Sequence, residues 1–181
     1  MKVIFVTHGE TIENASGILM GQAIGGELSP LGRRQAQVAG KELESIQIDA
    51  AYSSDLSRAV QTAEEILKYH RELKLILTEA LRERSFGSLQ GKNKDEVGWR
   101  NSMVNEDYGD FGTINSLCSR IGKFLIEIGR RYKNDTVLLV AHRNCGTALE
   151  CVVNRIPQSE ISTVTPMKNG EIRHYEFNYE K

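Results

Sequence analysis

One stretch decides the fold: Val3-Ile4-Phe5-Val6-Thr7-His8-Gly9-Glu10-Thr11. Its four apolar residues run into a polar turn, which predicts a buried strand that delivers a histidine at its carboxyl end. A second stretch of this design, Thr136-Val137-Leu138-Leu139-Val140-Ala141, stops at His142. Ligands bind outside the carboxyl ends of parallel strands in open α/β sheets. If the two strands lie side by side, His8 and His142 share one pocket.

The composition is that of an ordinary globular domain. The chain has 181 residues, of which 40% are hydrophobic and 26% charged, and its formal net charge is −1. We therefore expect a single domain over residues 1–181 that binds no nucleic acid. The N-terminal segment does not have the pattern of a signal peptide, and no apolar run approaches the length of a membrane span. We expect a cytoplasmic protein that does not enter a membrane.

The cysteines give no sign of a disulfide framework or a zinc site. The chain has three, Cys118, Cys145 and Cys151, and no C-x-x-C spacing. An odd number without that spacing indicates neither arrangement. We interpret Cys118 and Cys151 as small core residues.

Strands and helices alternate along the chain. Apolar runs predict further strands at 49–53 and 73–77, and helical spacing predicts helices at 30–45, 57–70, 115–132 and 147–153. Residues 171–179 alternate in polarity and predict a terminal strand at a sheet edge. This order is typical of a three-layer α/β/α fold with a mainly parallel central sheet.

Two glycine-rich segments interrupt the alternation. Residues 10–27 contain several glycines and predict a loop over the site. Residues 81–112 combine glycines with many charges, and predict an inserted, loop-rich segment with one short helix. Long insertions in compact domains are usually functional.

Three side chains are candidates for chemistry on a phosphate. His8 is a candidate nucleophile, and Gly9 beside it would let the backbone approach a ligand closely. Arg58 follows a strand-to-helix turn, where its guanidinium could fork onto phosphate oxygens. Glu83 could donate a proton if burial or the phosphate shifts its pKa. Each of them, taken alone, is also compatible with an ordinary structural or surface role.

Five motifs carry a family resemblance. In chain order they are Thr7-His8-Gly9-Glu10-Thr11-x-x-Asn14, Leu28-Ser29-Pro30-Leu31-Gly32-x-x-Gln35-Ala36, Ser53-Ser54-Asp55-Leu56-x-Arg58-Ala59-x-Gln61-Thr62-Ala63, Leu81-x-Glu83-Arg84-x-Phe86-Gly87-x-x-Gln90-Gly91 and Val140-Ala141-His142. Together they resemble the histidine phosphatase superfamily, the phosphoglycerate mutase-like proteins. The stretch Gln90-Gly91-Lys92-Asn93-Lys94 looks most like the cofactor-dependent phosphoglycerate mutases, as does Asn144.

The resemblance implies a phosphoglycerate mutase-like fold and phosphoryl transfer through a phosphohistidine. His8 would be the nucleophile, and Arg58 and His142 would hold the phosphoryl oxygens. Glu83 would protonate the leaving oxygen and later activate water or an acceptor. This is physically coherent, because phosphoryl transfer demands mostly positive charge and positioning. The resemblance implies no metal.

Further residues follow from the same resemblance as ligands of the substrate. Asn14 and Asn144 would be additional donors to phosphate oxygens. Arg84 and Lys94 would be substrate contacts. The partner would be a small phosphorylated substrate, bound by a monomer or a homodimer.

Two positions depart from the family pattern. Thr7 stands where the family has an arginine before the nucleophile, and Arg143 stands where the family usually has glycine or a small residue. Loss of a charged hydrogen-bond donor costs about 1.5–3 kcal/mol of binding. We hypothesise that the Arg143 guanidinium fills the space that Thr7 vacates; the alternative is that Arg143 points to solvent.

Several functions stay open. The first is a phosphatase of small phosphomonoesters, and the second a phosphoglycerate mutase proper, which alone would need 2,3-bisphosphoglycerate. Between residues 98 and 112 the chain offers only Arg100, beside Glu106, Asp107 and Asp110, which weakens the mutase alternative. The third is a relative weakened by Thr7 that binds phosphorylated ligands or a partner protein. A metal site built from His8, His142 and Glu83 is the remaining alternative.

Overall fold

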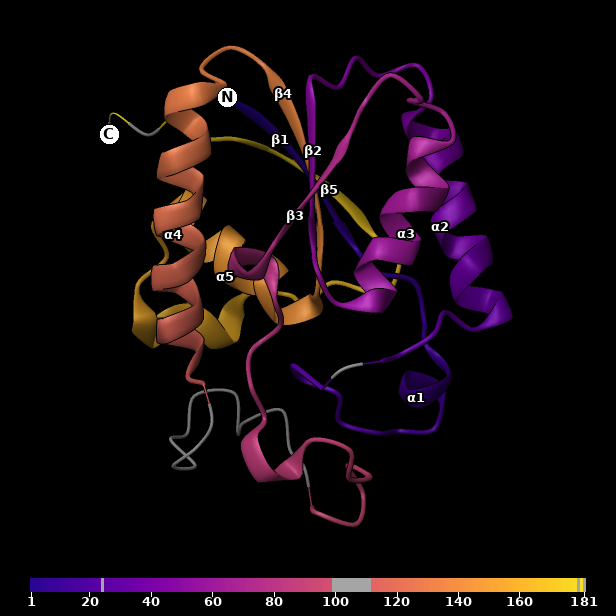
Figure 1. Ribbon diagram of the computed structural model, residues 1–181. Helices are drawn as coiled ribbons and strands as arrows, with labels where there is room; N and C mark the ends of the chain where they lie inside the picture. Colours follow the sequence, from indigo (N-terminus) through magenta and orange to yellow (C-terminus); the bar gives the residue numbers. More distant parts are fainter. Residues whose placement is uncertain (24, 99–111, 179, 181) are drawn as a thin grey trace.

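The computed structural model describes residues 1–181 except 24, 99–111, 179 and 181 (Figure 1). Its centre is a five-stranded sheet in the order β3-β2-β4-β1-β5. The strands are β1 (Lys2–Thr7), β2 (Ala50–Ser54), β3 (Leu75–Thr78), β4 (Thr136–Ala141) and β5 (Ile172–Glu176). β1 to β4 are mutually parallel, and β5 pairs antiparallel with β1 at the sheet edge. The mainly parallel sheet and the terminal edge strand are confirmed.

Helices cover both faces of the sheet (Figure 1). Helices α2 (Pro30–Leu43) and α3 (Ser57–Leu67) pack on one face, and α4 (Ile114–Arg131) and α5 (Arg143–Asn154) on the other. The core follows from strand alternation, since successive side chains point to opposite faces. On β1, Ile4 and Val6 pack toward α2 and α3, whereas Val3 and Phe5 pack toward α4 and α5.

The registry of β1 and β4 sets the level of the two histidines. Thr7 pairs with Ala141 in the parallel ladder. The next residue of each strand is a histidine, so His8 and His142 leave the sheet at the same level. The N–H of His8 also donates to the Ala141 carbonyl at 2.9 Å, which continues the ladder to the turn.

The start of α5 differs from the prediction. The helix begins at Arg143, with His142 as its N-cap, rather than at Thr147. The sequence favoured a turn there because of Gly146. A Cβ on Gly146 would lie 2.6 Å from the Met167 sulfur and 3.2 Å from the Phe5 ring, so this glycine is needed for packing inside a helix.

The glycine-rich segment at 10–27 contains a short helix that was not predicted, α1 (Ile12–Ala15). Thr11 and Asn14 form a capping box that starts it. Residues 17–19 pair with residues 91–94 through backbone hydrogen bonds of 2.8–2.9 Å. The loop after β1 and the 81–98 segment therefore form one layer beyond the carboxyl ends of the strands (Figure 1).

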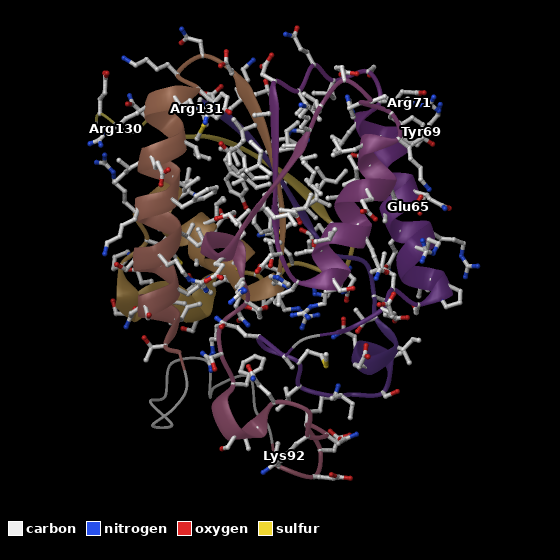
Figure 2. All side chains as sticks on the ribbon, in the orientation of Figure 1. Glu65, Tyr69, Arg71, Lys92, Arg130 and Arg131 are labelled. Atoms are coloured by element: carbon white, nitrogen blue, oxygen red, sulfur yellow. The ribbon has the colours of Figure 1, made fainter. Side chains whose placement is uncertain are left out.

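The remaining short helices are η1 (Glu79–Leu81), η2 (Gly87–Leu89) and η4 (Gln158–Thr163). Figure 2 shows Lys92 at the tip of the 81–98 segment, away from the sheet. The predictions for Arg100, Glu106, Asp107 and Asp110 lie outside the described residues. Among the helices of the described part, none has both the length and the apolar character required to cross a membrane.

The cysteines lie on the α4/α5 side. Cys145 and Cys151 are buried, and the half-buried Cys118 packs against the same core cluster. The interpretation of Cys118 and Cys151 as core residues is confirmed.

Candidate active site

The two predicted histidines meet at the carboxyl end of the sheet. Their ring centroids are 5.1 Å apart and the ring planes are inclined by 64°. His8 is 7% exposed and His142 is fully buried. Two imidazoles this close cannot both carry a proton charge without strong repulsion, so at least one must be neutral.

The backbone at Gly9 fixes the tautomer of His8. The Nδ1 atom of His8 lies 2.7 Å from the Gly9 carbonyl oxygen. A carbonyl only accepts, so Nδ1 carries the hydrogen and Nε2 keeps its lone pair. Burial, Arg58 and Arg143 together lower the pKa of His8 from 6.5 to about 3, against a smaller opposing effect of the Gly9 hydrogen bond. His8 is therefore a neutral imidazole with an unprotonated Nε2 at neutral pH.

Gly9 is required by a close contact between two backbone segments. A Cβ on Gly9 would lie 2.2 Å from the carbonyl oxygen of Gly32, and a Cβ on Gly32 would lie 1.9 Å from that of Glu10. The turn after β1 thus packs directly on the first turn of α2. Ser29 caps that helix as predicted, since its Oγ accepts the Gly32 N–H at 3.0 Å.

His142 is held by its other nitrogen. Its Nε2 lies 2.9 Å from the Oγ of Ser54, at the end of β2. Its Nδ1 is buried and has no hydrogen-bond partner among the described residues. Burial, followed by the charge of Arg58, lowers the pKa of His142 well below its ordinary value. His142 is thus also neutral, and offers Nδ1 where His8 offers Nε2.

Arg58 supplies the central positive charge. The side chain is 1% exposed, and its Nη2 donates to the Gly21 carbonyl at 2.7 Å. Its Nη1 is buried and finds no hydrogen-bond acceptor in the described part of the chain. A buried guanidinium with an unused donor is costly unless an anion completes it. The site is therefore built for a negatively charged group beside both histidines.

Glu83 is a buried carboxyl close enough to Arg58 for the two charges to interact. Its Oε1 accepts the Arg84 N–H at 2.8 Å and its Oε2 accepts the Asn144 N–H at 3.3 Å. Burial raises the pKa of Glu83, although these hydrogen bonds and Arg58 oppose the rise. A carboxyl with a raised pKa next to a nucleophile is the environment of a general acid.

The hydroxyl of Thr7 forms hydrogen bonds with a turn at residues 168–171. Its Oγ1 donates to the Lys168 carbonyl oxygen and accepts the Glu171 N–H at 3.2 Å. The backbone N–H of Gly170 donates to the carbonyls of Thr7 and His8, each at 3.2 Å. The threonine hydroxyl thus fixes residues 168–171 beside His8.

Arg143 faces the site from the first turn of α5. It lines the same cavity as Thr7 and His8, and its charge is one of the causes that lower the pKa of His8. Its side chain is exposed, and it makes no hydrogen bond or ion pair with the described residues. The guanidinium thus lies near His8, on the cavity side.

The other predicted ligands fall into two groups. Asn14 and Lys94 line the cavity, and the Asn14 side-chain oxygen accepts the Thr11 N–H at 3.4 Å, which leaves its amide N–H groups for a ligand. Asn144 also lines the cavity, and it contacts Glu83 through its backbone N–H and its side chain. Arg84 is 2% exposed and stacks on Phe86, with 5.4 Å between the guanidinium carbon and the ring centroid.

A cavity of about 860 Å³ opens over these groups. Its described lining includes His8, Arg58 and Glu83 on the sheet side. The rim adds apolar residues at 18–20 and 161–167 and two lysines, Lys94 and Lys168. The lining therefore combines an anion site with a mixed apolar and cationic rim. A volume of this size holds a small organic molecule.

Comparison with known proteins places the chain in a family. The family model described as histidine phosphatase superfamily (branch 1) matches residues 3–181. The chain belongs to the histidine phosphatase superfamily. The resemblance in the five motifs is thereby confirmed.

Relatives within the superfamily include mutases and phosphatases. A 2,3-bisphosphoglycerate-dependent phosphoglycerate mutase of Cytophaga hutchinsonii is 33% identical over 189 residues, covering 97% of this chain and 87% of the relative. The fructose-2,6-bisphosphatase TIGAR B of Danio rerio is 40% identical over 137 residues, covering 70% of this chain and 52% of the relative. The solved structure of a mycobacterial glucosyl-3-phosphoglycerate phosphatase has a TM-score of 0.84 at 25% identity, covering 96% of this chain and 91% of the other.

This superfamily site also contains residues that the sequence did not indicate. Asn169 donates from Nδ2 to the His8 carbonyl at 3.1 Å. Gln22 donates from Nε2 to the Glu83 carbonyl at 2.7 Å. Ser54 was quoted only as part of a motif, yet it holds His142. These contacts join segments that are far apart in the chain, and no local sequence pattern predicts them.

The metal alternative finds no support in the arrangement. No group of three or more His, Cys, Asp or Glu side chains within the described part of the chain is suited to hold a metal ion. His8, His142 and Glu83 do share the site, but the buried cation Arg58 lies among them. A fixed guanidinium at that place disfavours a second cation.

Proposed function

We propose that this protein transfers the phosphoryl group of small phosphomonoesters to water through a phosphohistidine on His8. The observation that carries the proposal is the state of His8. Its Nδ1–H is fixed by Gly9, its pKa is about 3, and its Nε2 is unprotonated. A neutral imidazole beside unused buried donors is prepared for in-line attack on phosphorus.

The reaction has two balanced steps. In the first, the Nε2 lone pair of His8 forms a bond to phosphorus while the bond to the leaving oxygen breaks, and Glu83 gives that oxygen its proton. In the second, water attacks phosphorus, the P–N bond breaks, and the Glu83 carboxylate takes the proton of water. Glu83 ends protonated again, and His8 returns to its neutral form.

Two buried nitrogens would stabilise the transferring group. The Nη1 of Arg58 and the Nδ1 of His142 have no partners among the described residues. If Ser54 donates its hydroxyl hydrogen to Nε2 of His142, the neutral ring carries its own hydrogen on Nδ1 and donates to a phosphoryl oxygen. Fixed donors in a dry site are the main source of transition-state stabilisation for this chemistry.

Arg143 is proposed to replace the arginine that Thr7 lacks. Its guanidinium lies in the cavity near His8, whereas the Thr7 hydroxyl is committed to residues 168–171. A guanidinium can bind two phosphoryl oxygens in a fork, which a threonine cannot. On this proposal the substitution moves a charge from the end of β1 to the start of α5 without removing it.

The substrate contacts follow from the cavity. Asn14 and Lys94 line it and are proposed to bind substrate oxygens. Asn144 and Arg84 were predicted as direct contacts. Asn144 lines the same cavity, so it is proposed both to bind substrate oxygens and to orient Glu83. Arg84 is 2% exposed and stacks on Phe86, which supports a role in holding the loop that carries Glu83.

The mutase alternative is favoured by a specific relative and by two lysines. The Cytophaga protein is named as a 2,3-bisphosphoglycerate-dependent mutase, and Lys94 and Lys168 could face the second phosphate of such a compound. Bound 2,3-bisphosphoglycerate would supply the phosphoryl group that His8 carries. The residues fit a bisphosphate, because the cavity holds cations beyond the Arg58 site.

The weakened relative is the third candidate, and it depends on Thr7. It predicts binding of phosphorylated ligands or a partner without turnover. The presence of Glu83 with a raised pKa argues against it, since a site that only binds phosphate needs no proton donor. The cytoplasmic location and the choice between monomer and homodimer remain predictions.

The experiment is a hydrolysis assay on p-nitrophenyl phosphate with a chelator present, beside a coupled mutase assay on 3-phosphoglycerate. The mutase assay is run with and without 2,3-bisphosphoglycerate. We expect hydrolysis that does not respond to the chelator. Isomerisation stimulated by the bisphosphate would favour the mutase, and activity in neither assay would favour the weakened relative.

A further inference from the structure

An arginine of another helix donates hydrogen bonds to the backbone carbonyls of the segment that carries Glu83. Arg120 lies on α4, and its Nη1 donates to the Glu79 carbonyl at 2.7 Å. Its Nη2 donates to the Arg82 carbonyl at 2.7 Å and to the Glu83 carbonyl at 3.3 Å. One guanidinium thus binds three carbonyls within residues 79–83, from the start of η1 to Glu83.

Two further side chains bind carbonyls of the same stretch. Gln22 donates to the Glu83 carbonyl, and the Cys145 thiol donates to the carbonyls of Leu81 and Arg82 at 3.3 and 3.2 Å. With its backbone carbonyl held in this way, Glu83 lines the cavity that also contains His8 and Arg58. The Arg84 N–H then reaches Glu83 Oε1.

We propose that Arg120 is a positioning residue that holds the Glu83 carboxyl in line with the leaving oxygen. The inference rests on the proposed function of Glu83 as the general acid. A planar guanidinium suits the role, because its donors have fixed directions and can satisfy several carbonyls at once. Arg120 touches no reacting atom, and a misplaced acid loses rate even when binding is intact.

The consequence depends on the leaving group. A nitrophenolate leaves with little help from an acid, whereas an alkoxide must be protonated as it leaves. Loss of Arg120 should therefore slow an alkyl phosphate more than an aryl phosphate. A purely structural defect would reduce both reactions by the same factor, so the ratio of the two distinguishes the roles.

The experiment compares kcat/KM for p-nitrophenyl phosphate and for glycerol 2-phosphate in the wild type and in Arg120→Met. We expect kcat/KM for the alkyl phosphate to fall at least about tenfold further than that for the aryl phosphate. Lys123→Met is the matched control, because it removes an exposed cation from the next turn of the same helix. It should leave the ratio unchanged.

Glu83→Gln distinguishes a failure of the general acid from a failure of the role proposed for Arg120. It should show the same dependence on the leaving group, and more strongly. If Glu83→Gln shows it and Arg120→Met lowers both substrates equally or neither, the acid stands and the role of Arg120 is refuted. If Glu83→Gln also affects both substrates equally, both proposals are wrong. Should Arg120→Met fail to fold, Arg120→Gln, which keeps an amide donor, is expected to change the ratio in the same direction.

Discussion

The ends of β1 and β4 have the same sequence pattern, but their histidines are held through different ring nitrogens. Each strand is a buried apolar run that stops at a histidine, and the two stop at the same level of the sheet. His8 is held through Nδ1 by the Gly9 carbonyl, and His142 through Nε2 by the Ser54 hydroxyl. One ring therefore offers Nε2 and the other Nδ1. The contact made by the other nitrogen decides the role of each ring.

The residues next to the two histidines also differ. At β1 the neighbour is Thr7, whose hydroxyl holds the turn at 168–171, and at β4 it is Arg143, whose guanidinium stays in the cavity. We propose that the positive charge near His8, which the family pattern places at the end of β1, comes here from the start of α5. Four predictions test this contrast, in order of expected effect.

The largest effect should come from the histidine at the end of β1. His8→Ala removes the nucleophile, so turnover should fall at least about 10³-fold and no phosphorylated protein should form. Steady-state rates and intact mass measure both. His174→Ala, at an exposed histidine of β5, is the control and should keep full activity. Persistent turnover in His8→Ala would remove the phosphohistidine mechanism.

The second prediction concerns Arg143, at the start of α5. Arg143→Gly should lower kcat/KM about 10- to 100-fold, because it removes a charged donor worth about 1.5–3 kcal/mol. Thr7→Arg in that background should restore much of the loss, by returning a guanidinium to the end of β1. Thermal unfolding of each variant checks that the start of α5 is intact. A neutral Arg143→Gly would refute the compensation.

The third prediction is a pH dependence of stability. His8 has a pKa of about 3 in the folded protein and 6.5 as its ordinary value, so the unfolded chain binds more protons between these limits. The wild type should then lose about 2 kcal/mol from this residue between pH 7.5 and pH 5. His8→Asn should lack that part of the loss in denaturant unfolding at the two pH values. Equal losses in both proteins would contradict the low pKa.

Glu83 has the opposite sign. Its folded pKa is raised, so its contribution to stability is full below the ordinary carboxyl value and disappears as the pH rises through the folded value. Measurement at pH 5 and pH 7.5 of Glu83→Gln therefore provides an independent check of the third prediction. The two variants should move the pH profile in opposite directions.

The smallest effect should come from the partner of His142. Ser54→Ala removes the hydroxyl that holds Nε2, and kcat should fall roughly three- to tenfold, the value of one hydrogen bond. Ser53→Ala is the matched control, since the Ser53 hydroxyl donates to the Ser54 carbonyl and not to a histidine. An equal response of the two serines would mean that the tautomer of His142 does not matter.

Much of the sheet could be predicted because its signals are local. The apolar runs of β1 and β4 and the Ser29-Pro30 start of α2 are confirmed close to their predicted bounds. The start of α5 could not be predicted, because Gly146 looks like a turn residue until Phe5 and Met167 are seen against it. A glycine required by packing has no local signature.

The site was predictable in its motifs and not in its supports. His8, Arg58, Glu83 and His142 were expected to meet, and the structure brings them together. The contacts of Asn169, Gln22 and Arg120 join segments far apart in the chain, and each is a single polar residue in a helix or loop. Such residues look like surface positions until the fold is known.

The most direct test of the central claim is the chemical position of the phosphoryl group on the trapped enzyme. The protein is mixed with p-nitrophenyl phosphate and quenched in alkali, and the phosphohistidine is located by mass spectrometry and 31P NMR. Since Nδ1 of His8 donates to Gly9, we expect phosphate on Nε2 of His8. Phosphate on Nδ1 of His8, or on His142, would contradict it.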